Sequence, residues 1–341
     1  MSSVSYNANH IPPLSVAPMM ARTDRHYRYF MRRLTKHTLL YTEMVTTGAI
    51  LYGDQDQHLA FDEEEHPLSL QLGGDNPDAL ARCAELAVQR YGYDEINLNV
   101  GCPSNRVQNG NFGACLMAQP ELVASCVAAM RNAVGVPVTV KHRIGIDDID
   151  QYEHMRHFVD VVADAGCKRF SVHARKAWLS GLSPKENRNV PPLRYDEVHR
   201  LKAERPDLDI EINGGITTLE QVSEQLSKVD AVMVGRAAYD NPYQFVTADR
   251  DIFGEPCAHI PSRREIATAM IPYLDRYVAN GGRLIHATRH IHNLFIGVPG
   301  AKRWRRYLSQ HSTQQGATSD VVKRAIDAVD SPPVKVPEAA H

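Results

Sequence analysis

The stretch DIEINGGITTLEQVSEQLSKVDAVMVGRA, residues 209–237, contains the unit from which the fold can be inferred. Two short runs rich in β-branched and apolar residues, at 209–215 and 231–237, are typical of buried strands, and the pattern between them at 218–227 is typical of a helix. A strand, a helix and a second strand in this order indicate two parallel strands joined by a right-handed crossover.

The same unit recurs toward the N-terminus. Further apolar runs lie at 15–20, 40–45, 68–73, 95–101, 136–145 and 169–175, and helical patterns at 24–35, 77–90, 120–134, 149–165 and 195–205 separate most of them. Eight such units in roughly 240 residues predict an α/β fold, a (β/α)8 TIM barrel. An open, doubly wound sheet is the alternative, although no GxGxxG follows the first run.

A C-terminal helical domain is expected after the barrel, because Ile266, Met270, Leu274 and Tyr277 have helical spacing. Residues 260–310 contain nine Lys and Arg but only two acidic residues, whereas the whole chain has a net charge of -2. A basic segment on an acidic body suggests a polyanionic partner. We therefore expect a disordered N-terminus at 1–10, a barrel at 11–258, a helical domain at 259–330 and a flexible tail at 331–341.

The composition narrows the class of protein. Hydrophobic residues make up 43% of the chain and charged residues 23%, which is typical of a globular protein. No apolar run reaches the length of about 18 residues that a membrane span needs, and the N-terminus does not resemble a signal peptide, so we expect a cytoplasmic protein. None of the six cysteines forms a CxxC pair. His286, His290 and His292 could suggest a metal site, but we expect no carboxylate partner near them. We expect a monomer without a bound metal.

The last two strand ends suggest a phosphate site. In such barrels the chemistry lies at the C-terminal ends of the strands, and a phosphate is often held after strands seven and eight. Glycines let the backbone amides approach an anion closely, and an arginine adds positive charge. Two tight turns with an incidental arginine are the structural alternative. The residues in question are Asn213, Gly214, Gly215, Gly235 and Arg236.

The other strand ends suggest an aromatic body for the ligand that carries this phosphate. Lys141 would stabilise the anionic reduced form of a flavin, and His173 would lie beside it. Gln71 can hydrogen-bond along the ring edge. A salt bridge from Lys141 to Glu43 or Glu95 is the structural alternative. The backbone that would cover one face of the ring consists of Pro18, Met19 and Met20.

The loop after the fourth strand suggests an acid. Cys102 stands at the strand end between Gly101 and Pro103, and a glycine-rich stretch that can move over a substrate follows it. The usual pKa of a cysteine thiol is about 8.5, so the thiol carries a proton at neutral pH and can donate it. The alternatives are an inert buried cysteine, or Cys115 as the acid.

Several of these stretches together resemble the tRNA-dihydrouridine synthase family, and the TEMV segment at 42–45 and the long run around Cys102 resemble its bacterial A-type subgroup most. The resemblance extends from residue 12 to residue 325. The stretches are SVAPMM (15–20), LQLGG (70–74), INLNVGCPSNRVQNGNFGACLM (96–117), VKHRIG (140–145), VHAR (172–175), EINGGI (211–216) and VMVGRAAYDNPY (232–243).

This resemblance implies a flavoenzyme that holds FMN, is reduced by NADPH and reduces uridine in the D-loop of tRNA at position 20 and the adjacent 20a. It assigns to Cys102 the role of proton donor to carbon 5, after hydride transfer to carbon 6. Such a base must be drawn out of its stack. The side chains that we expect to bind the uridine or the tRNA are Asn99, Arg143, Arg175, Lys185, Arg188, Lys302, Arg303 and Arg306.

Two other functions fit parts of the pattern. An FMN-dependent barrel that reduces a free small molecule, in the manner of dihydroorotate and ene reductases, would share the strand-end groups but would not need the basic helical segment. A protein that binds tRNA without catalysis would need the basic segment but not Cys102.

Overall fold

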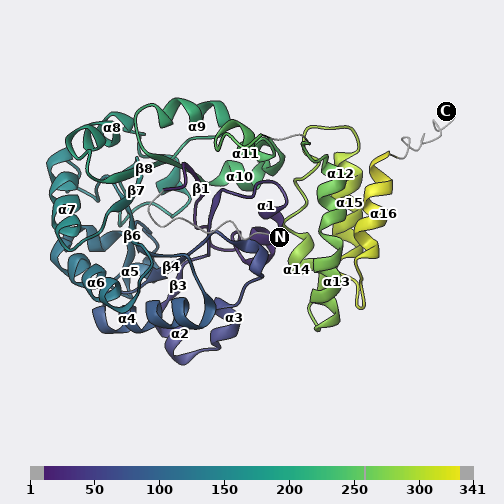
Figure 1. Ribbon diagram of the computed structural model, residues 1–341, viewed down its shortest axis with the longest axis horizontal. Helices are drawn as coiled ribbons and strands as arrows, with labels where there is room; N and C mark the ends of the chain where they lie inside the picture. The colour runs from purple at the N-terminus through teal and green to yellow at the C-terminus, as the bar shows by residue number, and fades with distance from the viewer. Residues whose placement is uncertain (1–10, 257–258, 331–341) are drawn as a thin grey trace.

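The computed structural model describes residues 11–256 and 259–330, and it shows a barrel with a group of helices packed against one side (Figure 1). The disordered N-terminus expected at 1–10, the flexible tail expected at 331–341 and the domain boundary expected at 258 lie outside the described residues.

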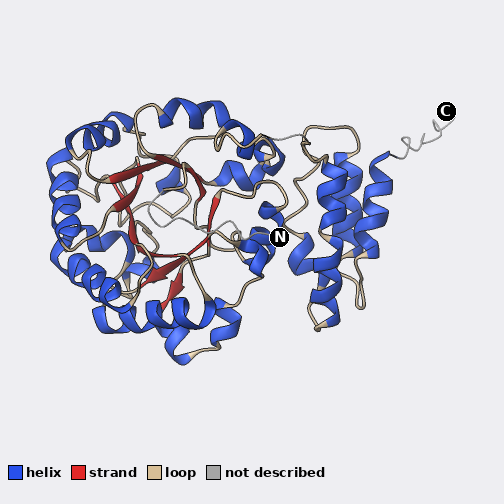
Figure 2. Ribbon diagram, in the orientation of Figure 1, coloured by secondary structure: helices blue, strands red, loops and turns tan. Residues whose placement is uncertain are grey.

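Eight parallel strands close into the barrel (Figure 2). The order is β2-β1-β9-β8-β7-β6-β5-β4, and β2 pairs with β4 to complete the circle. This closure confirms the TIM barrel and shows that the open sheet was wrong. The barrel strands are β1 (Leu14–Val16), β2 (Leu39–Tyr41), β4 (Leu68–Gly73), β5 (Glu95–Val100), β6 (Val138–Arg143), β7 (Arg169–His173), β8 (Asp209–Asn213) and β9 (Ala231–Val234).

The run at 40–45 is not one strand as expected. It is divided between β2 and a short strand, β3 (Val45–Thr46), which pairs with the C-terminal end of β4. The hydroxyl of Thr42 accepts a hydrogen bond from the backbone N–H of Gln71 (3.1 Å), so a side chain takes the place of a backbone acceptor where the strand is interrupted.

Helices surround the barrel at the six places where the sequence predicts them. Capping residues define several starts: Asn76 accepts from the N–H of Ala79 before Pro77, and Thr218 accepts from that of Gln221. These six helices are α1 (Arg25–Arg32), α4 (Pro77–Leu86), α6 (Pro120–Ala133), α7 (Tyr152–Asp164), α8 (Tyr195–Glu204) and α9 (Leu219–Leu226). Shorter ones are α2 (Thr47–Tyr52), α3 (Gln55–Leu59), α5 (Asn105–Gln108), α10 (Arg236–Asp240) and α11 (Ala248–Asp251).

The strands bury two different faces. Because successive side chains of a strand point to opposite sides, apolar residues such as Leu98 and Phe170 pack outward against the helices, and polar ones fill the interior. At the end of the barrel where the strands begin, Arg169 lies between two carboxylates. Its guanidinium is 3.3 Å from Glu95 Oε2 and 2.8 Å from Glu211 Oε1. These three buried residues are called the floor below.

The C-terminal region is helical, as the sequence predicts, and its described residues, 259–330, form five α-helices. Trp304 is buried at its centre, where it packs on Phe295 and donates from Nε1 to the carbonyl of Ile291 (3.0 Å). The helices are α12 (Arg263–Ala269), α13 (Ile271–Ala279), α14 (Leu284–Thr288), α15 (Ala301–His311) and α16 (Asp320–Asp330). No helix of the described chain is both long and apolar enough to cross a membrane.

The helical region is joined to the barrel through α1. His26 Nδ1 lies 2.6 Å from Tyr273 Oη, and His290 Nε2 lies 2.9 Å from Asp24 Oδ2. The expectation that His290 has no carboxylate neighbour was therefore wrong, because folding brings Asp24 to it from 266 residues away.

Candidate functional site

Because all eight strands are parallel, the polar residues that end them meet at one opening of the barrel, which we call the mouth. Each of the expected strand-end groups belongs to a strand or to the loop directly after it. They are Pro18–Met20 after β1, Gln71 on β4, Asn99 and Cys102 at the end of β5, Lys141 and Arg143 on β6, His173 and Arg175 at the end of β7, Asn213–Gly215 at the end of β8, and Gly235 and Arg236 after β9.

The backbone around Cys102 is held firmly. Asn99 Oδ1 accepts hydrogen bonds from the N–H groups of Gly101 (3.1 Å) and Cys102 (3.0 Å), and the carbonyl of Cys102 accepts one from Ala114. Gly113 has a φ of +79°, and a Cβ there would lie 2.6 Å from the carbonyl oxygen of Cys102. The glycine therefore allows the loop to fold back against the backbone of Cys102, whose side chain is half-buried.

Cys115 has a different environment. Its thiol donates to the carbonyl of Phe112 (3.2 Å), and burial raises its pKa. These contacts fit a packing residue better than an acid.

Lys141 is a cation without a carboxylate partner. Its Nζ donates to Asn213 Oδ1 (3.0 Å), and it forms no ion pair with any carboxylate in residues 11–256 and 259–330. Loss of hydration on burial, with repulsion from Arg143, lowers the pKa of Lys141 to about 8. The alternative of a salt bridge to Glu43 or Glu95 was wrong, because Glu95 pairs with Arg169 and Glu43 accepts from the backbone N–H of Ala21.

His173 is held neutral. Burial lowers its pKa well below the usual value, and repulsion from neighbouring cations, Arg143 first among them, adds to this effect. Its ring packs against the backbone of Gly214, where a Cβ would lie 2.8 Å from Cδ2.

The turn after β8 needs its glycines. Gly214 and Gly215 have φ values of +118° and +72°, and a Cβ on Gly215 would collide with Leu193 at 2.5 Å. A Cβ on Gly235 would meet only Ala17, at 3.9 Å, so this glycine leaves open space at the mouth.

The guanidinium of Arg175 has a hydrogen-bond donor without an acceptor among the described residues. Its Nε is buried and has no hydrogen-bond partner among the described residues, while its Nη1 donates to the carbonyl of Pro191. An anion at this turn would supply the missing acceptor.

Arg143 was expected to face the substrate, but the structure uses it to join two loops. Its Nε donates to the carbonyl of Gly101 (3.1 Å), and its Nη1 donates to the carbonyls of Lys176 (3.1 Å) and Asn187 (2.9 Å). The guanidinium is buried, so it holds the loop of Cys102 against the loop after β7.

The side chain of Gln71 and the segment after β1 are the remaining parts of the mouth. Gln71 is buried and hydrogen-bonds to Asn97 and Asn99. Met19 accepts from two backbone N–H groups through its carbonyl, Pro18 is half-buried, and Met20 is 62% exposed.

The outer basic residues divide into two groups. Lys185, Arg188, Lys302 and Arg306 are exposed, as is Arg236, whose Nη2 lies 3.4 Å from the carbonyl of Arg188. Arg303 differs from our expectation: its guanidinium donates to the carbonyls of Ala328 (2.8 Å) and Val329 (2.7 Å). A cation is favourable at the last carbonyls of a helix, so Arg303 ties α15 to the end of α16.

Sequence reasoning missed Gln108 and the strained loop positions. Gln108 Nε2 donates to the carbonyls of Pro103 (2.9 Å) and Leu179 (2.8 Å), a second link between the two loops, and no local pattern reveals a partner 71 residues away. Within residues 11–256 and 259–330, three residues other than glycine have positive φ, and all lie in loops at the mouth: Ala21, Asn111 and Asp147. Such strain gathers at functional sites.

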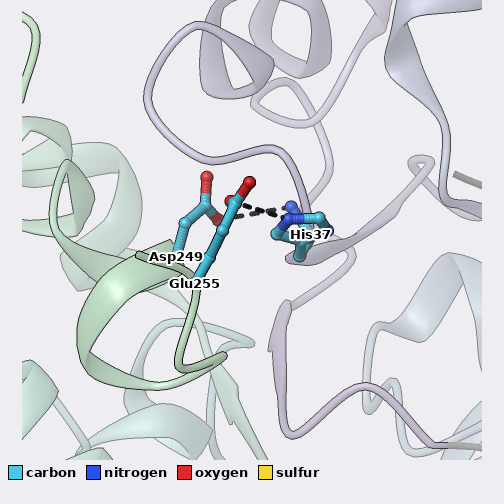
Figure 3. A group of neighbouring side chains, drawn as sticks. All are labelled: His37, Asp249 and Glu255. Carbon is cyan, nitrogen blue, oxygen red and sulfur yellow. Dashed lines mark hydrogen bonds and ion pairs between the residues drawn. The ribbon is translucent and has the colours of Figure 1, made fainter. Parts of the chain in front are cut away.

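One group of metal-ligand types lies away from the mouth, on the loop before β2 and around α11 (Figure 3). Its members already have protein partners: Asp249 accepts from the hydroxyl of Thr35 (2.6 Å) and the N–H of Lys36 (2.8 Å), and His37 Nε2 lies 2.9 Å from Glu255 Oε2. We interpret the group as a hydrogen-bonded latch that joins the end of the barrel chain to its beginning.

Comparison with known proteins shows to which protein family the chain is similar. The family model for dihydrouridine synthases matches residues 15–330. A protein of Synechocystis sp. named tRNA-dihydrouridine(20/20a) synthase is 61% identical over 326 residues, which cover 96% of this chain and 97% of that protein. Proteins with the same name are 59% identical in Shewanella oneidensis (93% and 94% covered) and 56% identical in Escherichia coli K12 (92% and 91% covered).

Several solved structures resemble this chain in fold, at low sequence identity. A complex of 2-naphthoyl-CoA reductase with 2-naphthoyl-CoA has a TM-score of 0.54 at 11% identity, covering 72% of this chain and 50% of that one. TcOYE with pHBA has a TM-score of 0.51 at 13% identity, covering 74% and 92%.

Proposed function

The chain belongs to the dihydrouridine synthase family, and from this premise we propose that it reduces uridine to 5,6-dihydrouridine in tRNA. The names of its relatives support positions 20 and 20a as the target. The observation that carries the proposal is the position of Cys102 at a mouth whose half-buried cation, Lys141, has an amide oxygen as its partner and no carboxylate among the described residues. A site of this kind suits an electron-rich or anionic ligand.

We propose FMN as that ligand and NADPH as the reductant. Gly214, Gly215, Gly235 and Arg236 would hold the phosphate, and the unpartnered Nε of Arg175 supports an anion there. Lys141 and His173 would hold the ring, with Gln71 at its edge and Pro18, Met19 and Met20 over one face. When bound, the flavin supplies a hydride to carbon 6 of the uracil ring.

The chain's own residues complete the reduction. After hydride arrives, negative charge develops on carbon 5 and on the conjugated carbonyl oxygen of the uracil. The thiol of Cys102 delivers a proton to carbon 5, and the cation of Lys141 lowers the energy of the charged state. Asn99 keeps the backbone of Cys102 in place for this transfer.

We propose that the barrel, 11–258, is the catalytic domain and that 259–330 bind tRNA. Four exposed cations support this: Lys185 and Arg188 at the mouth, and Lys302 and Arg306 on α15. Folded RNA is recognised largely through its shape and backbone, which suits such a scattered set. We further propose that the protein acts as a monomer in the cytoplasm.

Cys102→Ser tests the chemistry. We expect the variant to bind FMN and to be reduced by NADPH as the wild type is, while reoxidation of the flavin by tRNA slows by about a hundredfold or more, because serine is a much weaker acid. Stopped-flow absorbance of the flavin measures both half-reactions. Undiminished reoxidation by tRNA would remove Cys102 from its role, and reoxidation of the wild-type flavin that does not respond to tRNA would favour a free small-molecule substrate.

A further inference from the structure

A continuous path of hydrogen bonds connects the floor of the barrel to the backbone of Cys102. It begins at Glu95 Oε1, which accepts from the hydroxyl of Thr139 (3.0 Å), and Thr139 Oγ1 in turn accepts from Asn97 Nδ2 (2.8 Å). Asn97 Oδ1 accepts from Gln71 Nε2 (2.8 Å), and Gln71 Oε1 accepts from Asn99 Nδ2 (2.8 Å). The last oxygen, Asn99 Oδ1, accepts from the backbone of Gly101 and Cys102.

Every bond of this path points the same way, and both ends require that direction. A carboxylate can only accept, so Glu95 makes the hydroxyl of Thr139 a donor. At the other end a backbone N–H can only donate, so Asn99 must present its oxygen to Cys102. If the amide of Asn97 turned over, two NH2 groups would face each other at Gln71, and the conflict would pass along the path to Asn99.

The path has little freedom to relax. Glu95, Thr139, Asn97 and Gln71 are at most 1% exposed, and Asn99 is 9% exposed. Neighbouring members lie on paired strands, with Gln71 opposite Asn97 and Asn97 opposite Thr139. An unmade hydrogen bond in this interior would not be replaced by bulk water.

We propose that Glu95 is a positioning residue for Cys102, acting from the floor through Thr139, Asn97, Gln71 and Asn99. This inference rests on the proposed function only for its consequence, which is the placement of the thiol for proton transfer. The placement itself is a property of the chain.

Ser69 provides a matched control. Its hydroxyl donates to the same oxygen of Glu95 at 2.9 Å, but unlike that of Thr139 it passes no bond onward to Asn97. Ser69→Ala therefore removes one hydrogen bond from Glu95 and leaves the path intact. Thr139→Val and Thr139→Ala remove a similar bond and interrupt the path, and Thr139→Ser preserves it.

The first measurement is hydrogen exchange of the peptide that contains Gly101 and Cys102, on the protein without tRNA. Losing one hydrogen bond shifts an equilibrium by about tenfold, so we expect both hydroxyl-free Thr139 variants to speed this exchange about tenfold. Thr139→Ser should restore the wild-type rate, and Ser69→Ala should change it less than about twofold. Equal rates in Thr139→Val and Ser69→Ala would overturn the proposal, since the path would not reach Cys102.

The second measurement is reoxidation of the flavin by tRNA. We expect kcat to fall about tenfold in Thr139→Val with KM for tRNA unchanged, because a displaced acid slows the chemical step and not the binding. A rise of KM with unchanged kcat would contradict a positioning role. If the wild type did not respond to tRNA, the proposed function would fail, while the exchange rates would still decide whether the path through Thr139, which joins Glu95 to Asn97, positions Cys102.

Discussion

At the floor of the barrel Arg169 lies between two carboxylates, whereas at the mouth Lys141 donates to the amide oxygen of Asn213 and forms no ion pair with a carboxylate of the described chain. Both cations lie in the same barrel, on neighbouring strands. The difference indicates two uses of charge inside the barrel: a paired charge maintains the structure, and a charge left without a counter-ion is available to a ligand.

The largest expected effect tests the floor. Arg169→Met leaves Glu95 and Glu211 buried without their cation, and we expect the free energy of unfolding to fall by about 3–5 kcal/mol. Urea denaturation measures this change. The neighbouring Lys168 is exposed, so Lys168→Met should alter stability by less than about 0.5 kcal/mol. Equal losses in the two variants would mean that the floor does not depend on its ion pairs.

A third environment sharpens the comparison, because His142 is fully buried and has no carboxylate partner in the part of the chain that the structure describes. It packs between Phe158 and Phe170, its Nδ1 lies 2.7 Å from the carbonyl of Arg143, and burial lowers its pKa to about 4. The unfolded chain, with an ordinary pKa near 6.5, binds the proton more readily. The contribution of neutral His142 to the free energy of unfolding is therefore fully present above pH 6.5, and it is lost as the pH falls toward 4.

His142→Asn removes this titration and keeps a nitrogen near the carbonyl of Arg143. Between pH 7 and pH 4 we expect the wild type to lose about 3 kcal/mol more unfolding free energy than the variant, since each pKa unit corresponds to about 1.4 kcal/mol. Urea denaturation at several pH values provides the comparison. Parallel pH curves for the two proteins would show that His142 is not held neutral.

At the mouth, Lys141→Met should affect binding and not stability. We expect FMN affinity to fall at least about tenfold, because a charge-assisted contact is lost, while urea denaturation changes little. Lys176 is the matched control: it also lies near the mouth, but it pairs with Asp150 at 3.0 Å. Lys176→Met should leave FMN affinity unchanged in a fluorescence titration. A large loss of stability in Lys141→Met with unaltered FMN affinity would reverse the interpretation of the mouth.

The smallest effect concerns the exposed cations of α15. Lys302→Ala combined with Arg306→Ala should weaken tRNA binding and reduce the slope of log affinity against log salt by roughly 1.5, since each phosphate contact contributes about 0.7–0.9. Arg303→Ala should leave the slope unchanged and lower the melting temperature, because Arg303 binds the carbonyls of Ala328 and Val329. The opposite result would mean that Arg303 exchanges these carbonyls for phosphates.

Local pattern was enough to predict the barrel, its eight strands, the six principal helices and the gathering of strand-end groups at one opening. The reason is that parallel strands separated by helices permit few topologies, and in a closed barrel all strand ends meet. The motif around Cys102 was equally readable, because a strand end, a glycine and a proline are adjacent in the chain.

The partners of individual side chains were decided only by folding. Lys141 and Arg143 look alike in the sequence, since both are cations at the end of one strand. In the structure, Lys141 contacts an amide oxygen, whereas Arg143 binds three carbonyls from two separate loops. The same holds for Arg303, and for Glu95, whose path to Cys102 uses three strands. Hydrogen-bond partners of this kind depend on distances between distant segments, which periodicity and spacing along one chain do not encode.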